Sequence, residues 1–304
     1  MKKSITFKNF DYNMAGDLYL PEGMDETKKY PAIVVVHPGG GVKEQTAGLY
    51  AEKLSELGYI ALAFDASYQG ESGGEPRFLE DPSARVEDVS WAVDYLVTNE
   101  NVDSERIGVL GICAGGGYSV NAAGFDRRIK AVGTVSGIDI GGLFRASFGE
   151  NPAPAIIQLL ESVGNQRTEE AKGADFLTIP YVPNSPEEFN ENTPEYAKEA
   201  YDYYRTPRAM YPTSENKMLF RSIPKIMSYN AFSQVGDFLT QPIVMIVGKN
   251  ADTAYFSENT INEIKTDHKE LYWIDGATHV SLYDVPEHVN KAVAKLKEFY
   301  GRYL

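Results

Sequence analysis

Apolar residues recur along the chain in short unbroken runs that alternate with segments of helical periodicity. The run at 32–36, Ala-Ile-Val-Val-Val, is followed by His-Pro-Gly-Gly-Gly at 37–41. An unbroken run of this length is typical of a strand that is buried on both faces of a parallel sheet. Apolar positions then repeat at helical spacing over 50–57 and stop at Gly58, which is a common C-terminal signal for a helix.

The same alternation continues along the chain. The first twenty residues predict a hairpin, and apolar runs predict further strands at 59–64, 106–110, 129–135, 243–247 and 271–274. Helices are predicted from Asp81-Pro82, at 114–124, at 256–264 and from Asp284. The residues from Asp284 to Glu287 suggest a capping box at the start of the last helix. Regular strand–helix alternation predicts an α/β fold with a doubly wound, mostly parallel sheet and right-handed crossovers.

Residues 139–238 interrupt this alternation. The segment contains proline and acidic clusters, one helical run at 194–208, and seven tyrosines between Tyr181 and Tyr229. An interruption of this length inside a continuing α/β pattern predicts an inserted lid, so we expect a core made of 1–138 and 239–304 and a cap made of 139–238. The tyrosines of the cap are expected either to roof a substrate pocket or simply to pack the lid.

Composition narrows the classes of function. The 304 residues are 43% hydrophobic and 24% charged, and 29 basic against 43 acidic residues give a net charge of −14. This negative field disfavours a nucleic-acid partner. The sequence shows neither a long apolar span nor an export signal, and a single cysteine permits no internal disulfide. We therefore expect a cytoplasmic protein with a small-molecule substrate, no membrane partner, no cofactor and no metal; homo-oligomerisation is left open.

The strongest chemical motif is Gly-Ile-Cys-Ala-Gly at 111–115, which lies between a predicted strand and a predicted helix. This is the nucleophile-elbow pattern, in which a tight turn exposes Cys113 and the next N–H, that of Ala114, faces the substrate oxygen. A second match, Gly-Glu-Ser-Gly-Gly at 70–74, is followed by Glu-Pro and no helix. We interpret Ser72 as a loop residue and Cys113 as the nucleophile.

Four histidines could serve as the base for Cys113. The order nucleophile, acid, histidine excludes His37, and His268 and His288 lie in a polar turn and in the final helix. His279 follows the strand at 271–274, in the loop where the base is expected.

The orienting acid should follow the strand at 243–247. Asp252 is the carboxylate in that loop and is predicted to hold His279 through the far ring nitrogen, although it could instead cap the next helix. For the second oxyanion donor, the glycines at 39–41 offer N–H groups without side chains, so Gly39 and Gly40 join Ala114 as candidates.

With these residues in place, the sequence resembles the dienelactone hydrolase-like branch of the α/β hydrolases. The elbow at 111–116, His279 and Asp252 carry the resemblance, and the glycine segments at 37–41 and 70–74 extend it to fungal polyketide transferases and thiohydrolases. The resemblance implies a Cys113–His279–Asp252 triad, with the N–H groups of Gly39 and Ala114 in the oxyanion hole.

Two departures from the family pattern concern the substrate and the thiol. Dienelactone hydrolases are shorter and lack an insertion like 139–238. They also carry a glutamate after the first parallel strand that holds the resting thiol; Pro38 takes that place here, and Glu44 lies six positions further on. Our working hypothesis for activation is a preformed thiolate–imidazolium pair.

The sequence thus predicts a cysteine hydrolase of an ester, lactone or thioester that works through a covalent acyl-enzyme. An acyltransferase that uses the same three residues with an alcohol or thiol acceptor is the alternative. A non-catalytic binding protein on this fold is a third hypothesis, disfavoured by the ordered presence of all three residues.

Overall fold

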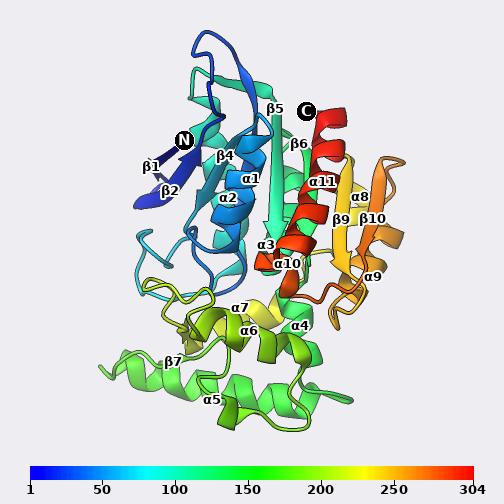
Figure 1. Cartoon of the computed structure of the whole chain (residues 1–304). Helices are drawn as coiled ribbons and strands as arrows, with labels where there is room; N and C mark the ends of the chain where they lie inside the picture. Colours follow the sequence, from blue (N-terminus) through cyan, green and yellow to red (C-terminus); the bar gives the residue numbers. More distant parts are fainter.

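The computed structural model describes residues 1–304, which form one eight-stranded sheet with helices on both faces (Figure 1). The strand order is β1-β2-β4-β3-β5-β6-β9-β10, and β2 pairs antiparallel with both neighbours while all pairs from β4 to β10 are parallel. The strands are β1 Lys2–Lys8, β2 Asn13–Tyr19, β3 Tyr30–Val36, β4 Ile60–Phe64, β5 Val102–Ile112, β6 Ile129–Val135, β9 Ile243–Gly248 and β10 Lys269–Ile274. The predicted α/β class and mostly parallel sheet are confirmed.

Two hydrophobic cores lie on opposite faces of the sheet. Alternate residues of β3 enter each, with Val34 and Val36 in the first core and Ile33 and Val35 in the second, as strand geometry requires. The first core is covered by α2 Pro82–Val97, α3 Ala114–Phe125 and α9 Tyr255–Glu263, and the second by α1 Thr46–Glu56, α10 Ser281–Asp284 and α11 Pro286–Tyr303. Burial on both faces explains why these strands are continuous apolar runs.

Most predicted elements match the structure, and two predictions need correction. β5 begins at Val102, earlier than expected, because its polar first half still pairs with β3 at Tyr30. The capping box at Asp284 is wrong: α11 is capped by the Val285 backbone, and the Asp284 carboxylate instead binds Arg208.

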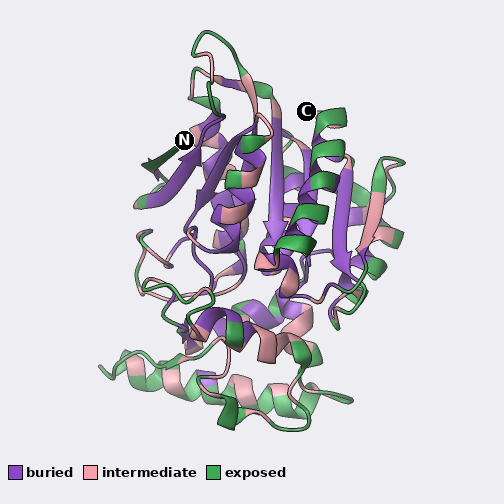
Figure 2. Cartoon of the chain, viewed as in Figure 1, coloured by how far each residue is buried: buried purple, intermediate pink, exposed green.

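Most of residues 139–238, the predicted insertion, lies across the carboxyl ends of the parallel strands, whereas α8 at its end packs against α3 and α9 beside the sheet (Figure 1). It contains α4 Ile140–Ala146, α5 Ala153–Ala171, α6 Glu195–Arg205, α7 Ile223–Ser228, α8 Val235–Phe238, the short strands β7 Thr178–Ile179 and β8 Met218–Leu219, and the 3₁₀ turns η1 Pro186–Glu188 and η2 Phe220–Ser222. Figure 2 shows that α5 forms the outer layer, and Val163 is its one buried residue. The insertion therefore covers the edge where sites of α/β sheets form.

No helix in the structure is both long enough and apolar enough to cross a membrane.

Candidate active site

Cys113 occupies a strained turn between β5 and α3. Its backbone has φ 55° and ψ −122°, a region that residues with a Cβ rarely adopt. The turn is fixed by three hydrogen bonds: the N–H of Cys113 donates to the Val135 carbonyl, and its own carbonyl accepts from Gly116 and Ile138. The turn has the predicted place in the chain, and it leaves the half-buried thiol at the carboxyl end of β5.

The flanking glycines permit this turn. A Cβ on Gly111 would lie 2.2 Å from the Gly115 carbonyl oxygen, and a Cβ on Gly115 would lie 2.4 Å from that of Val36. Both obstacles are backbone atoms, which cannot move aside as a flexible side chain can. The elbow pattern here is therefore a steric requirement.

His279 lies in the loop after β10, as predicted, and lines the same cavity as Cys113. It is 3% exposed, and its carbonyl accepts a hydrogen bond from Ser136, which fixes the loop to the end of β6. Nδ1 pairs with the Thr253 hydroxyl at 2.5 Å, and Nε2 pairs with the Tyr283 hydroxyl at 3.1 Å. Burial lowers the pKa of His279 to about 4, so the ring is neutral at pH 7.

The predicted acid, Asp252, lies in the expected loop but points elsewhere. Its exposed carboxylate accepts a hydrogen bond from the Tyr196 N–H in the first turn of α6, and neither a hydrogen bond nor an ion pair joins it to His279. It does not cap α9 either, where Ala254 is the N-cap. A carboxylate at the N-terminus of α6 stabilises that helix, so in this geometry Asp252 holds the insertion.

Backbone N–H groups surround the thiol on its other side. Those of Ala114 and Gly39 lie near enough to the sulfur that both lower the pKa of Cys113. These are the two donors that the sequence assigned to an oxyanion hole. Gly40, the third candidate, is not among the groups that contact the sulfur; its φ of +71° turns the loop, and its carbonyl accepts from Ser214.

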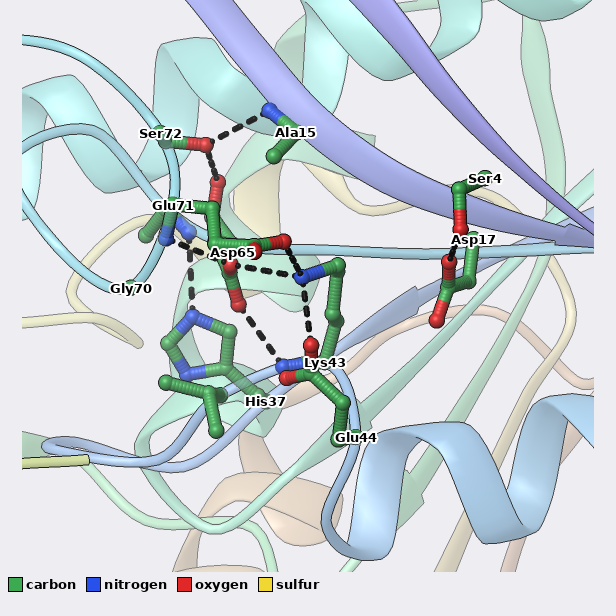
Figure 3. A network of polar contacts seen from close by, with 12 residues as sticks. Ser4, Ala15, Asp17, His37, Lys43, Glu44, Asp65, Gly70, Glu71 and Ser72 are labelled. Carbon is green, nitrogen blue, oxygen red and sulfur yellow. Dashed lines mark hydrogen bonds and ion pairs between the residues drawn. The ribbon is translucent and has the colours of Figure 1, made fainter. Parts of the chain in front are cut away.

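Two ionic clusters, each built around a buried cation, hold the loop that contains Gly39. At its start, Arg85 donates to the His37 carbonyl at 2.8 Å and pairs with Glu80 at 3.3 Å. At its end, Lys43 is surrounded by three carboxylates, at 2.6 Å from Glu44, 3.1 Å from Asp65 and 2.6 Å from Glu71 (Figure 3). These clusters fix the loop from both sides. Glu44 belongs to the second cluster, so it does not take the place of the family's glutamate.

The buried surroundings of Cys113 and His279 favour a neutral thiol and a neutral imidazole at rest. Burial raises the pKa of the Cys113 thiol, against the lowering effects of Tyr283, the two N–H groups and Arg85, while burial lowers that of His279. Both shifts oppose ionisation. The hypothesis of a preformed thiolate–imidazolium pair is therefore not supported, because the low-dielectric surroundings penalise both charges.

A cavity of about 90 Å³ lies over the thiol. Its floor includes Cys113, Ala114 and Gly39, and thirteen of its sixteen lining residues are hydrophobic. The insertion contributes four aromatic residues to the wall, namely Phe144, Tyr181, Tyr196 and Tyr204. The Tyr204 hydroxyl is buried without a hydrogen-bond partner. His268 and His288 do not line this cavity.

Sequence reasoning missed two contacts of the histidine. Thr253 directly follows Asp252, and the sequence gives no reason to choose the hydroxyl over the carboxylate. Tyr283 lies four residues after His279, a spacing that places two side chains on one face of a helical turn, and this signal was available.

Comparison with known proteins identifies the family. A profile of the "Dienelactone hydrolase family" matches residues 14–137. The uncharacterised protein YcjY of Escherichia coli is 42% identical over 99% of this chain and 98% of its own length. The crystal structure of the hypothetical protein PA2218 from Pseudomonas aeruginosa superposes with a TM-score of 0.90 at 33% identity, covering 100% of this chain and 94% of that one. The polyketide transferase claH of Penicillium crustosum is 27% identical over 92% of this chain and 91% of its own. The chain belongs to the dienelactone hydrolase family and is an α/β-hydrolase enzyme.

Proposed function

We propose that this enzyme cleaves an ester, lactone or thioester through a covalent acyl-enzyme on Cys113. The observation that carries the proposal is the placement of the thiol: it lies on a strained turn at a cavity, and the N–H groups of Ala114 and Gly39 are near enough to lower its pKa. A carbonyl attacked by the sulfur would place its oxygen within reach of both donors, which stabilise the developing negative charge.

His279 is the base in this proposal. Its neutral ring accepts the thiol proton as the sulfur attacks the carbonyl carbon, and it later activates the water that releases the acyl group. Thr253 orients the ring by accepting a hydrogen bond from Nδ1–H, which leaves Nε2 free to act as the acceptor. Asp252 contributes by holding α6 over the cavity.

The cavity indicates the substrate class. At about 90 Å³ it is much smaller than the 300–1,000 Å³ of a typical drug-sized pocket, and its walls carry no charged side chain. We infer a short, uncharged acyl group. The unpaired Tyr204 hydroxyl offers one hydrogen bond to an oxygen of that group or of its leaving group.

Acyl transfer is the second candidate. It is favoured by the similarity to claH, which is named as a polyketide transferase. The chemistry of acylation is the same, and an alcohol or thiol replaces water in the second step.

Intact-mass spectrometry tests both candidates. The protein is mixed with p-nitrophenyl esters from acetate to octanoate and with the matching acyl thioesters, and wild type is compared with Cys113→Ala and His279→Gln. We expect a transient adduct of acyl mass on wild type, none on Cys113→Ala, slow formation on His279→Gln, and a preference for short chains. An equal adduct on Cys113→Ala would contradict the proposal. Product analysis with water alone, and then with added alcohols or thiols, separates hydrolysis from transfer.

A further inference from the structure

A tyrosine hydroxyl lies between the proposed nucleophile and its base. No direct hydrogen bond joins the Cys113 sulfur to the His279 ring; instead, Nε2 pairs with the Tyr283 hydroxyl at 3.1 Å, and the same hydroxyl is close enough to the thiol to lower its pKa. All three side chains line the same cavity.

The surrounding structure holds Tyr283 in this position. The residue is 2% exposed, and its ring packs edge-on against Tyr203 at 5.2 Å and against His279 at 5.6 Å. Its N–H donates to the Val280 carbonyl, and its carbonyl accepts from the Thr46 hydroxyl on α1 at 3.1 Å. Contacts from three elements therefore fix where the hydroxyl lies.

The hydroxyl remains protonated. Burial and the nearby thiol raise the pKa of Tyr283 well above its usual range. A neutral phenol has one proton to donate and lone pairs that accept another, so it can bond to the imidazole and the thiol at the same time.

We infer that Tyr283 is a catalytic residue that relays the proton from the thiol of Cys113 to His279. As the sulfur attacks the carbonyl carbon, the S–H bond breaks and its proton bonds to the phenol oxygen. The original phenol proton moves to Nε2 in the same step, so the tyrosine ends neutral and the imidazole becomes cationic. The reverse transfer delivers a proton to the leaving group. This inference rests on the proposed acyl-enzyme function.

The test counts the protons that move during acylation. The burst of p-nitrophenol from p-nitrophenyl acetate is measured by stopped flow in mixtures of H₂O and D₂O, for wild type, Tyr283→Phe and Tyr203→Phe. Tyr203 is the matched control because it is a buried neighbour of Tyr283 that does not line the cavity. For wild type and Tyr203→Phe we expect a curved dependence on deuterium fraction, which indicates two protons. For Tyr283→Phe we expect acylation about 10²-fold slower and a linear dependence.

Other outcomes overturn the relay. If Tyr283→Phe acylates at the wild-type rate, or if its dependence on deuterium stays curved, the tyrosine does not carry the proton. If Tyr283→Phe does not fold, 3-fluorotyrosine at position 283 keeps the shape and hydroxyl but lowers the pKa of the phenol, and an unchanged isotope dependence and rate would again overturn the inference. Failure of the proposed function is distinct, because Cys113 of the wild type would then form no acyl adduct at all.

Discussion

Two clusters in the molecule combine a hydroxyl or thiol with a buried histidine, and their comparison shows what distinguishes a candidate reactive site from a structural network. Ser72, His37 and Asp65 are all buried and close together (Figure 3), and Ser72 even lies in a glycine-flanked pentapeptide. The second cluster is Cys113 with His279. By residue type alone, the first has the better claim to be a catalytic triad.

Hydrogen bonding separates them. The Ser72 hydroxyl donates to the Asp65 carbonyl at 2.6 Å and accepts from the Ala15 N–H at 2.9 Å. Both ring nitrogens of His37 are likewise occupied by backbone, at Pro38 and Ala66. Around Cys113, by contrast, the Tyr204 hydroxyl is buried at the cavity without a hydrogen-bond partner. Unsatisfied polar groups around a cavity mark a site, whereas complete satisfaction marks a structural network.

The largest expected difference comes from removing each nucleophilic atom. Cys113→Ala should lower kcat/KM for a p-nitrophenyl ester by about 10³-fold or more, because the proposed acyl-enzyme forms on its thiol. Ser72→Ala should change it by less than about threefold but reduce the free energy of unfolding by roughly 1–3 kcal/mol, since the Ala15 N–H loses its buried partner. Burst kinetics and urea unfolding of both variants check this. A large activity loss in folded Ser72→Ala would contradict the distinction.

The two histidines should differ in the same way, with His279 needed for activity and His37 for stability. His279→Gln should slow acylation by about 10²–10⁴-fold, the usual contribution of a general base. His37→Leu should lower the free energy of unfolding by roughly 3 kcal/mol, because the Ala66 N–H and the Pro38 carbonyl lose buried partners. Stopped-flow acylation and chemical unfolding at pH 7 measure the two effects. Unchanged stability in His37→Leu would show that this network is dispensable.

Two variants with smaller expected effects identify the residue that orients the ring of His279. Thr253→Val should lower kcat/KM about tenfold, because a hydrogen bond worth roughly 1–1.5 kcal/mol orients the ring. Asp252→Asn should cost less than about threefold, since its carboxylate is exposed and binds α6. Steady-state kinetics on both variants decide between the two residues. The opposite ranking would restore Asp252 as the orienting acid.

The smallest expected change is in the pH profile. Because burial lowers the pKa of His279 to about 4, the ring stays neutral well below pH 6.5, and protonation removes the base only near the lowered value. We expect kcat/KM to vary less than about twofold between pH 5 and 8. A thiolate–imidazolium pair would instead give a bell-shaped profile across this range. Initial rates with a p-nitrophenyl ester, corrected for the ionisation of the product, distinguish the two.

The sequence predicted those parts of the site that local rules determine. Cys113 could be placed at the turn between β5 and α3 because such a tight turn restricts its neighbours to small residues, and His279 could be placed in the loop after β10 by its position in the chain. The partner of His279 could not, because the choice between Asp252 and Thr253 depends on α6, which lies more than fifty residues away in sequence. α5 was missed because almost all of its residues stay exposed, so burial imposes no clear apolar stripe on it.

Tyr181 gives the insertion an anchor inside the core. Its hydroxyl donates to the fully buried Glu80 at 2.7 Å, the same carboxylate that binds Arg85 under the loop of Gly39. Raising the insertion would break this bond, and hydrogen bonds to charged groups contribute roughly 1.5–3 kcal/mol. At that energy only a few per cent of the molecules would be open at any moment. Substrate entry would then depend on a sparsely populated state, and the rate of opening could limit turnover independently of the chemistry at Cys113.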